Sequence, residues 1–258
     1  MPSVLLEIKD SIAFITLNRP EKLNSFNREM ALLLQEKLDE CNTTKEVRCL
    51  YLTGSGKGFC AGEDLAEVVD PNGPGMQKIL GEQFNPIIKK IRNLEKPVVA
   101  AINGVAAGAG ANIALSCDIV VAHQSASFIQ AFSKIGLIPD SGGTFFLPRL
   151  IGMQKASAIM MLGDKISAEE AEKIGMIYKV FANDVFEVES KKIAATLSQM
   201  PTRGLWLTKK ALNKSFGHSL KKQLEFEDEL QQQAASTNDF KEGVQAFLEK
   251  RQPNFKGE

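Results

Sequence analysis

Short apolar segments alternate with amphipathic segments over most of the chain. Val4–Lys9 and Ile12–Leu17 are rich in β-forming residues and are separated by Asp10-Ser11, which predicts an antiparallel hairpin. From Asn27 to about Cys41 the apolar residues recur at helical spacing, which predicts a helix with one buried face. Further strands are predicted at 47–53, 97–102, 119–122 and 176–181. Strands separated by helices are typical of an α/β domain whose helices pack on a parallel sheet.

The same part of the chain carries the signals of several more helices. A helix predicted over 76–94 contains Pro86, which should kink or split it. It follows a segment, Val69–Met76, whose Asp, Asn, Pro and Gly residues predict a surface loop. Ser167-Ala-Glu-Glu170 fits a capping box that opens a short helix. The remaining helices are expected at 144–151, 154–162 and 185–199.

The chain beyond Met200-Pro201 has a different pattern. It contains no strand candidate, and helices are predicted at 201–214, 218–235 and 237–249. We therefore expect a core formed by residues 1–200 and a helical C-terminal subdomain formed by residues 201–258.

Composition limits the classes of function. The 31 basic residues balance 31 acidic ones, so no overall field attracts nucleic acid or an anionic membrane. No apolar run reaches the roughly 20 residues that span a bilayer, and the N-terminus lacks the pattern of a secretory signal. Cys41, Cys49, Cys60 and Cys117 have no metal-ligand spacing, which predicts buried, reduced thiols. The expectation is a cytoplasmic globular protein without a metal, a nucleic-acid partner or a membrane partner.

One acidic residue occupies an unusual turn within Gly136–Thr144. Pro139 stiffens the approach to Asp140, and Gly142 and Gly143 permit close backbone contacts afterwards. Leucine, isoleucine and phenylalanine flank this turn, so desolvation should raise the pKa of the carboxyl group. A carboxylate of this kind can act as a general base near neutral pH. The alternative is that Asp140 only caps the helix that follows.

Two further turns are rich in small residues and follow predicted strands. They are Gly58–Leu65 and Asn103–Asn112. The N–H groups at the start of a helix are unpaired and lie at the positive end of its dipole. Two such donors that meet at one point form an oxyanion hole, which stabilises a carbonyl as it becomes an enolate. Tight packing of strand against helix is an equally good explanation of each turn taken alone.

Taken together and in this order, the three segments resemble the crotonase superfamily of enoyl-CoA hydratases and isomerases. The resemblance extends from Ile8 to Phe255. It includes Asn18-Arg-Pro, Lys96–Gly104, Cys117-Asp-Ile119 and Gly163–Ala168. It implies a crotonase-type α/β spiral of ββα turns, closed by C-terminal helices that form trimers or dimers of trimers and cover the active site. It also implies a coenzyme A (CoA) thioester as substrate, with no separate cofactor.

The resemblance also assigns roles to particular residues. The two oxyanion donors correspond to the backbone N–H groups of Glu63 and Ala109, and the proton-transfer group corresponds to Asp140. Only the N–H of Glu63 is expected to matter, because Asp140 already transfers the proton. Contacts with the acyl group or with CoA are expected at Lys22, Ala61, Asp64, Leu65, Gly110, Asn112, Phe132 and Lys256.

Two departures from the hydratase pattern indicate the reaction. Hydratases of this superfamily use two glutamates, and the corresponding positions here hold Asn112 and Phe132, neither of which can exchange a proton with water. The typical hydratase has glycine where this chain has Asp140. These differences predict an isomerase.

Longer segments narrow the resemblance to the 1,2-epoxyphenylacetyl-CoA isomerases of aerobic phenylacetate degradation. They are 106–111, 128–140, 143–149 and 239–251. The resemblance implies conversion of the ring epoxide to oxepin-CoA, with 3-enoyl-CoA to 2-enoyl-CoA isomerisation as a second activity. The alternatives are an isomerase of ordinary fatty enoyl-CoA thioesters, a hydratase, and a non-catalytic scaffold or RNA-binding relative.

Overall fold

Two β-sheets of unequal size form the centre of the structure, a computed structural model that describes residues 1–258. The larger sheet has the order β1-β2-β3-β5-β7-β10, and all of its strands are parallel except β1. The smaller sheet has the order β4-β6-β8-β9, with β9 antiparallel to β8. The strands are β1 (Val4–Lys9), β2 (Ile12–Leu17), β3 (Cys49–Gly54), β4 (Gly58–Cys60), β5 (Val98–Ile102), β6 (Val105–Ala107), β7 (Ile119–His123), β8 (Ser127–Ile129), β9 (Lys165–Ser167) and β10 (Lys179–Phe181).

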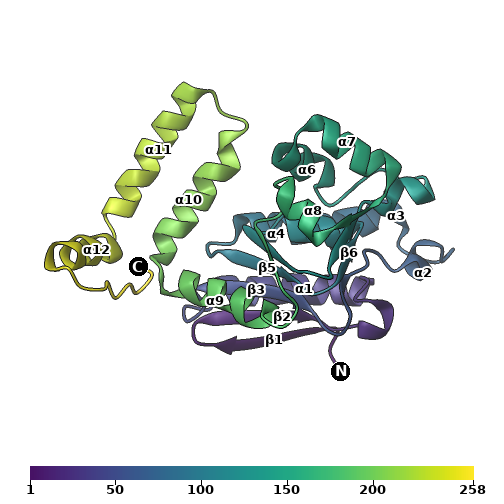
Figure 1. Ribbon diagram of the computed structural model, residues 1–258, viewed down its shortest axis with the longest axis horizontal. Helices are drawn as coiled ribbons and strands as arrows, with labels where there is room; N and C mark the ends of the chain where they lie inside the picture. The colour runs from purple at the N-terminus through teal and green to yellow at the C-terminus, as the bar shows by residue number, and fades with distance from the viewer.

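Helices follow the strands in a repeating order (Figure 1). The α-helices are α1 (Arg28–Thr43), α2 (Leu65–Val68), α3 (Gly75–Lys78), α4 (Asn85–Asn93), α5 (Ala109–Leu115), α6 (Gly143–Ile151), α7 (Met153–Leu162), α8 (Ala168–Lys173), α9 (Phe186–Gln199), α10 (Thr202–Ser215), α11 (Leu220–Ala235) and α12 (Asn238–Glu249). The 3-10 helices η1 (Pro20–Lys22) and η3 (Ala131–Ile135) and the π-helix η2 (Ile79–Phe84) complete the set. In three successive turns the chain passes from the larger sheet to the smaller one, as β3-β4, β5-β6 and β7-β8. This is the spiral of ββα turns that the resemblance implied.

The predicted N-terminal hairpin is confirmed. β1 and β2 pair over six residues each, and their turn residues, Asp10 and Ser11, have φ of 50° and 62°. Positive φ at both central positions produces the turn whose twist matches that of the flanking strands.

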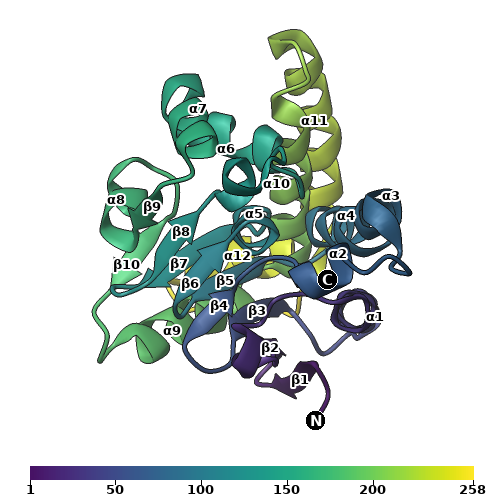
Figure 2. The same cartoon turned by 90° about the vertical axis from the view of Figure 1, so that its right-hand side faces the viewer.

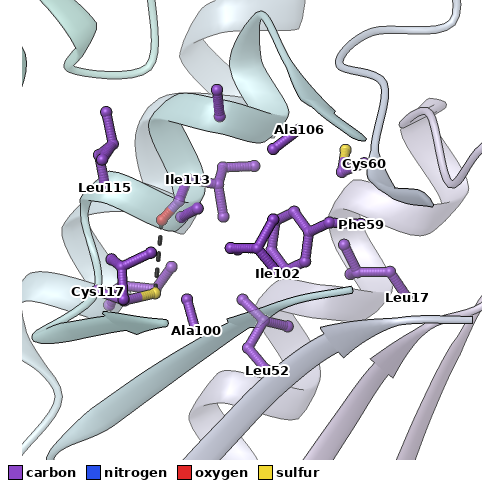
Figure 3. Close-up of a cluster of buried hydrophobic side chains, with 14 of the residues drawn as sticks. Leu17, Leu52, Phe59, Cys60, Ala100, Ile102, Ala106, Ile113, Leu115 and Cys117 are labelled. Carbon is purple, nitrogen blue, oxygen red and sulfur yellow. Dashed lines mark hydrogen bonds between the residues drawn. The ribbon is translucent and has the colours of Figure 1, made fainter. Parts of the chain in front are cut away.

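Alternating side chains of the larger sheet divide into two apolar cores. Leu50 and Leu52 of β3 join the main core, whereas Cys49 and Tyr51 face the opposite side, beneath α9. Figure 2 shows α9 and α5 on opposite sides of this sheet. Figure 3 shows the part of the main core where Phe59 and Ile102 meet the side chains of α5. Because both faces of the parallel strands are covered, their sequences are nearly continuous apolar runs.

All four cysteines are free and buried, as predicted. Burial raises the pKa of the Cys41 thiol to about 11 and that of the Cys60 thiol to about 12. Neutral thiols are poor nucleophiles, so these side chains act as small apolar residues of the core.

The predicted helix over 76–94 forms one uninterrupted helical segment, and Pro86 does not split it. It consists of α3, the wider π-turns of η2 and then α4, in which Pro86 occupies the first turn. Pro86 has no N–H group to donate, and the wider π-turns lie directly before it in the segment. The sequence did not predict the smaller sheet, because its strands have only three residues each and three residues show no periodicity.

Only helices follow residue 200, as predicted. α10, α11 and α12 lie at one side of the molecule, away from the strands (Figure 1). Arg48 joins this part to the sheets, because its Nε donates to Thr202 Oγ1 at 2.9 Å and its Nη1 donates to the carbonyl oxygen of Phe255 at 2.8 Å. Lys209 Nζ of α10 lies 2.9 Å from Asp118 Oδ2. No helix in the structure is both long enough and apolar enough to cross a membrane.

Candidate active site

The turn after β4 exposes one backbone donor. Gly62 O accepts from Phe26 N and Asp64 N donates to Phe26 O, each at 2.7 Å. Both hydrogen bonds are made by the residues on either side of Glu63, and both reach Phe26. Because successive groups of an extended chain point to opposite sides, the N–H group of Glu63 points away from Phe26. Gly62 has φ of 97°, which a side chain would oppose.

The turn after β6 exposes a second donor. Gly108 combines φ of 52° with ψ of −128°, a conformation essentially restricted to glycine, and Ala109 then begins α5. As the first residue of the helix, Ala109 has no intrahelical partner for its N–H group. Gly110 lies against β4, because a Cβ added there would be 2.5 Å from the carbonyl oxygen of Cys60.

The two turns lie against each other. A Cβ placed on Gly62 would be 3.0 Å from the carbonyl oxygen of Ala107 and 3.5 Å from the backbone nitrogen of Ala109. The glycines therefore allow two separate β-α turns to approach within van der Waals distance. This arrangement has the form of a two-donor site for a carbonyl oxygen.

The Asp140 turn is the third component. Ser141 and Gly142 have φ of 50° and 76°, and α6 begins at Gly143. The Asp140 carboxylate accepts from Ser141 Oγ at 2.8 Å and makes no capping bond to α6, whose N-cap residue is Gly142. The alternative that Asp140 merely caps this helix is therefore wrong. Left-handed geometry at a non-glycine residue costs of order 1–3 kcal/mol, and such strain is typical of functional turns.

Three loops enclose a cavity of about 200 Å³ around Asp140. Its lining consists of Ala61, Gly62, Glu63, Leu65, Val68, Met76, Ile79, Phe84, Gly108, Ala109, Ala131, Phe132, Lys134, Ile135, Leu137 and Asp140. Six predicted residues are thus brought together: Ala61, Glu63, Leu65, Ala109, Phe132 and Asp140. The cavity is smaller than the roughly 300–1,000 Å³ of pockets for drug-sized ligands, so it suits the acyl end of a larger molecule.

Two of the residues that line the cavity, Asp140 and Glu63, are acidic, and burial raises the pKa of both. Desolvation raises the pKa of Asp140, and the bond from Ser141 opposes this effect in part. Desolvation also raises the pKa of Glu63, to about 8, with further contributions from the negative charges of Glu67 and Asp140. Perturbed carboxyl groups in an apolar cavity are typical of sites of proton transfer.

Comparison with known proteins identifies the family. The model of the enoyl-CoA hydratase/isomerase family matches residues 7–258. The chain belongs to the enoyl-CoA hydratase/isomerase family. It is 45% identical over 260 residues to 1,2-epoxyphenylacetyl-CoA isomerase from Escherichia coli, covering 100% of this chain and 99% of the relative.

Other relatives in the enoyl-CoA hydratase/isomerase family carry different names. The chain is 42% identical to a probable enoyl-CoA hydratase from Rhodobacter capsulatus, covering 99% of this chain and 98% of the relative. The crystal structure of a putative enoyl-CoA hydratase/isomerase from Mycobacterium abscessus has a TM-score of 0.92 and 34% identity, covering 98% of each chain. These comparisons confirm the crotonase fold, with its helical C-terminal part.

Some predicted contact residues lie outside the cavity of this family member. Asp64 pairs with Arg19 at 3.0 Å and caps α2 through its side chain. Lys22 and Lys256 are exposed and do not line the cavity, so their contact with CoA phosphates remains a prediction. Gly110 and Asn112 are buried within α5. Neither residue is among those that line the cavity, so their contact with substrate stays a prediction.

Asn112 holds the Asp140 turn in place. Its Nδ2 donates to the carbonyl oxygen of Asp140 at 2.9 Å, and its Oδ1 accepts from Gln130 Nε2 at 2.7 Å. A Cβ added to Gly143 would be 2.4 Å from the same Nδ2, so α6 packs directly on this amide. The structure thus supports a packing role for Asn112 at this turn.

Replacing Asn112 tests this structural role. Asn112→Leu should lower the free energy of unfolding by about 2–4 kcal/mol, because the Asp140 carbonyl and the Gln130 amide lose their buried partner. Urea denaturation followed by circular dichroism measures the change. Asn183→Leu, at an exposed turn, is the matched control. Equal stability of the two variants would contradict the role given to Asn112.

The sequence missed two contributions to the cavity. The first is the Glu63 carboxyl group, whose oxygens are buried at this cavity residue without a hydrogen-bond partner. The second is the apolar set from α2, α3 and η2, which includes Val68, Met76 and Ile79. An apolar residue of a short helix gives no sign of which cavity it will line, so only the tertiary structure could reveal this set.

The raised pKa of Glu63 makes stability depend on pH. The carboxyl ionises near 4.5 when unfolded and near 8 when folded. Between these values the folded state holds a proton that the unfolded state has lost, so the free energy of unfolding falls as pH rises, by at most ~1.4 kcal/mol per pH unit. The Glu63→Gln variant has no carboxyl group to titrate at this position, so its free energy of unfolding does not fall with pH for this reason. After discounting for solvent, we expect the variant to be about 2 kcal/mol more stable than wild type at pH 8.5.

Urea denaturation at pH 5, 7 and 8.5 measures this difference, with Glu7→Gln on the exposed edge strand as control. The advantage of Glu63→Gln should shrink towards zero near pH 5. A difference that does not change with pH would show that the Glu63 carboxyl titrates normally.

A larger hollow, of about 560 Å³, lies between α10 and α6. Its only carboxylate, Asp118, is held in two ion pairs, with Arg92 at 3.2 Å and with Lys209 at 2.9 Å. Arg92 also bonds to Asn213. Because the only carboxylate of this hollow is already paired with two cations, the smaller cavity with Asp140 is the better candidate for catalysis.

Proposed function

We propose that this protein isomerises acyl-CoA thioesters and that its substrate is 2-(1,2-epoxy-1,2-dihydrophenyl)acetyl-CoA, which it converts to oxepin-CoA. The observation that carries the proposal is the position of the Asp140 carboxyl group, in the same small cavity as the Glu63 and Ala109 turns. The epoxide as substrate is supported by the 45% identity to the Escherichia coli 1,2-epoxyphenylacetyl-CoA isomerase.

The two turns supply the hydrogen-bond donors that stabilise the thioester oxygen. The thioester oxygen accepts hydrogen bonds from the N–H groups of Glu63 and Ala109. As the α-proton leaves, negative charge accumulates on this oxygen, and the fixed donors stabilise it without reorganising. One such donor typically contributes about 3 kcal/mol to transition-state stabilisation.

Asp140 supplies the proton transfer. Its ionised carboxylate removes a proton from the α-carbon, and the electron pair of the C–H bond passes into the dienolate. With the epoxide in equilibrium with its oxepin form, the dienolate extends into the ring. The carboxylic acid then returns the proton to a ring carbon, which forms the new C–H bond and restores the thioester. No atom is gained or lost, so one acid–base group completes the cycle.

The residues present argue against hydration as the main reaction. Water addition in this family requires two acid–base side chains to orient and activate the water. The corresponding positions hold Asn112, which is engaged by Asp140 and Gln130, and Phe132, which lines the cavity. Neither can take a proton from water.

A product assay tests the proposal. Purified protein is incubated with the epoxide thioester and, separately, with a 3-enoyl-CoA and crotonyl-CoA, and products are separated by chromatography. We expect oxepin-CoA from the first, with the highest kcat/KM, and slower formation of 2-enoyl-CoA from the second. Faster hydration of crotonyl-CoA would favour the hydratase, and a preference for the 3-enoyl-CoA would favour the second candidate, a general enoyl-CoA isomerase.

We further propose that the C-terminal helices associate copies of the chain into a trimer or a dimer of trimers. Their exposed apolar residues are Leu220, Leu224, Phe240, Val244, Phe247 and Leu248. Apolar surface gathered on one part of a protein typically marks an interface. Sedimentation equilibrium at micromolar concentration should give three or six times the 28.2 kDa of the chain, and a monomer would contradict this assembly.

A further inference from the structure

Gln130 is a buried polar side chain that lies close to the cavity without lining it. It is 1% exposed and directly follows β8. Its Nε2 donates to Asn112 Oδ1 at 2.7 Å, and Asn112 Nδ2 donates to the carbonyl oxygen of Asp140 at 2.9 Å. Two buried amides thus form a chain of hydrogen bonds from the end of β8 to the Asp140 turn.

The acceptor at the end of this chain fixes its direction. A carbonyl oxygen can only accept, so the Asn112 amide turns its Nδ2 towards Asp140 and its Oδ1 towards Gln130. Gln130 must then donate, because its own amide oxygen would face the Asn112 oxygen without a proton between them. The Gln130 donor therefore determines which way the Asn112 amide faces.

The Asp140 carboxylate depends on its backbone for its position, because its own hydrogen bond is to the adjacent Ser141 hydroxyl. The turn that follows has φ of 50° at Ser141 and 76° at Gly142. The Asp140 carbonyl oxygen also accepts from Gly143 N at 2.8 Å, which is a bond within the turn. The bond from Asn112 is different in kind, because it ties this strained turn to α5.

The segment that carries Gln130 also holds the second donor turn. Gly108 N donates at 2.8 Å to the carbonyl oxygen of Ile129, the residue directly before Gln130. Asn112 N donates to Gly108 O at 3.2 Å, within the first turn of α5. Gln130 therefore lies where the donor turn, α5 and the Asp140 turn meet.

We propose that Gln130 is a positioning residue for the isomerisation, which acts through Asn112 to hold the Asp140 carboxylate in register with the Ala109 donor. Proton removal requires the base and the donors to engage the same thioester at once. A misplacement of about 1 Å can lower a rate by about 10²-fold. This inference rests on the proposed function in one respect, that Asp140 removes the α-proton of an acyl-CoA thioester.

Gln130→Met tests the inference, because methionine has a similar length but no N–H donor. We expect kcat on the epoxide thioester to fall about tenfold or more, while the Kd of a substrate analogue changes by less than about twofold. Gln130→Asn keeps an amide that is too short to reach Asn112 Oδ1, so it should separate kcat from Kd in the same way. Gln124→Met, at an exposed position, is the matched control and should retain wild-type kcat.

A double-mutant cycle distinguishes action through Asn112 from a local effect of residue 130 on the cavity. In the Asn112→Leu background the chain of hydrogen bonds is already broken, so Gln130→Met should lower kcat by no more than about twofold further. Equal losses of kcat in the two backgrounds would overturn the inference. A loss of analogue binding as large as the loss of kcat would also overturn it, because it would indicate general damage to the site.

Exchange of α-protons gives a readout that does not require isomerisation. Phenylacetyl-CoA has no epoxide to rearrange, but in D₂O its α-carbon can lose a proton to Asp140 and regain a deuteron from the same carboxyl group. Mass spectrometry measures the rate, which Gln130→Met should lower by about the same factor as kcat.

This exchange also separates the inference from the proposed reaction. Wild type that exchanges α-protons but does not convert the epoxide thioester would refute the proposed substrate, and slower exchange by Gln130→Met would still support the positioning role. Equal exchange rates in wild type and Gln130→Met would overturn the inference, whether or not the epoxide thioester is converted.

Discussion

Asp140→Asn should lower kcat for isomerisation by at least about 10³-fold, on the epoxide thioester and on a 3-enoyl-CoA alike. The amide cannot accept the α-proton, and the neighbouring carboxyl group of Glu63 is buried and largely protonated at neutral pH. The fold should survive, because Asn112 bonds to the backbone carbonyl of residue 140 and the Ser141 hydroxyl can donate to an amide oxygen. Replacing a buried carboxyl group by a neutral one also removes a desolvation cost.

Steady-state kinetics and calorimetric binding of a substrate analogue should therefore respond differently to Asp140→Asn. The Kd of the analogue should change little while kcat falls. Asp164→Asn, at an exposed position after α7, is the matched control and should retain wild-type kcat. Turnover by Asp140→Asn at the wild-type rate would refute the assignment of the base.

The pH profile of wild type follows from the same group. The raised pKa of Asp140 means that kcat/KM should fall as pH falls through this value, at a higher pH than an ordinary aspartate would give. The acidic limb should be absent from the residual activity of Asp140→Asn.

Gly110→Ala should have the second largest effect. The added Cβ would lie 2.5 Å from the carbonyl oxygen of Cys60 and 2.6 Å from its Sγ, and the first of these is a backbone atom that cannot move away alone. α5 must shift from β4, and the shift separates the N–H group of Ala109 from that of Glu63. Loss of one aligned donor typically lowers kcat by about 10²–10³-fold, and overpacking lowers the free energy of unfolding by about 1–3 kcal/mol.

Because the thioester carbonyl is common to all substrates, Gly110→Ala should lower kcat by similar factors on the epoxide thioester and on a 3-enoyl-CoA. Gly81→Ala is the control, since a Cβ there would meet nothing within 4 Å. Full activity in Gly110→Ala, or loss on only one substrate, would show that the two donor turns do not act on the carbonyl.

Local signals in the sequence predicted much of the fold. The hairpin at Asp10-Ser11, the amphipathic α1, the capping box at Ser167 and the C-terminal helices all occur where the pattern placed them. Each of these features depends on residues close together in the chain, so periodicity and turn chemistry are sufficient to locate it. The strand β10 is shorter than predicted, because Met176 and Ile177 precede it and pack in the core outside the sheet.

The sequence by itself determined the α/β class, the position of the Asp140 turn and the two glycine-rich turns that precede α2 and α5. Only the tertiary structure decided which residues share the cavity: it includes Val68, Met76 and Ile79 and excludes Asn112, Lys22 and Lys256. The physical reason is that this selection depends on contacts between turns about 45 and 30 residues apart, set by how the two sheets and α5 pack. Composition and periodicity report a residue's immediate neighbours, whereas the direction of a side chain and the pKa it acquires depend on the packed surroundings.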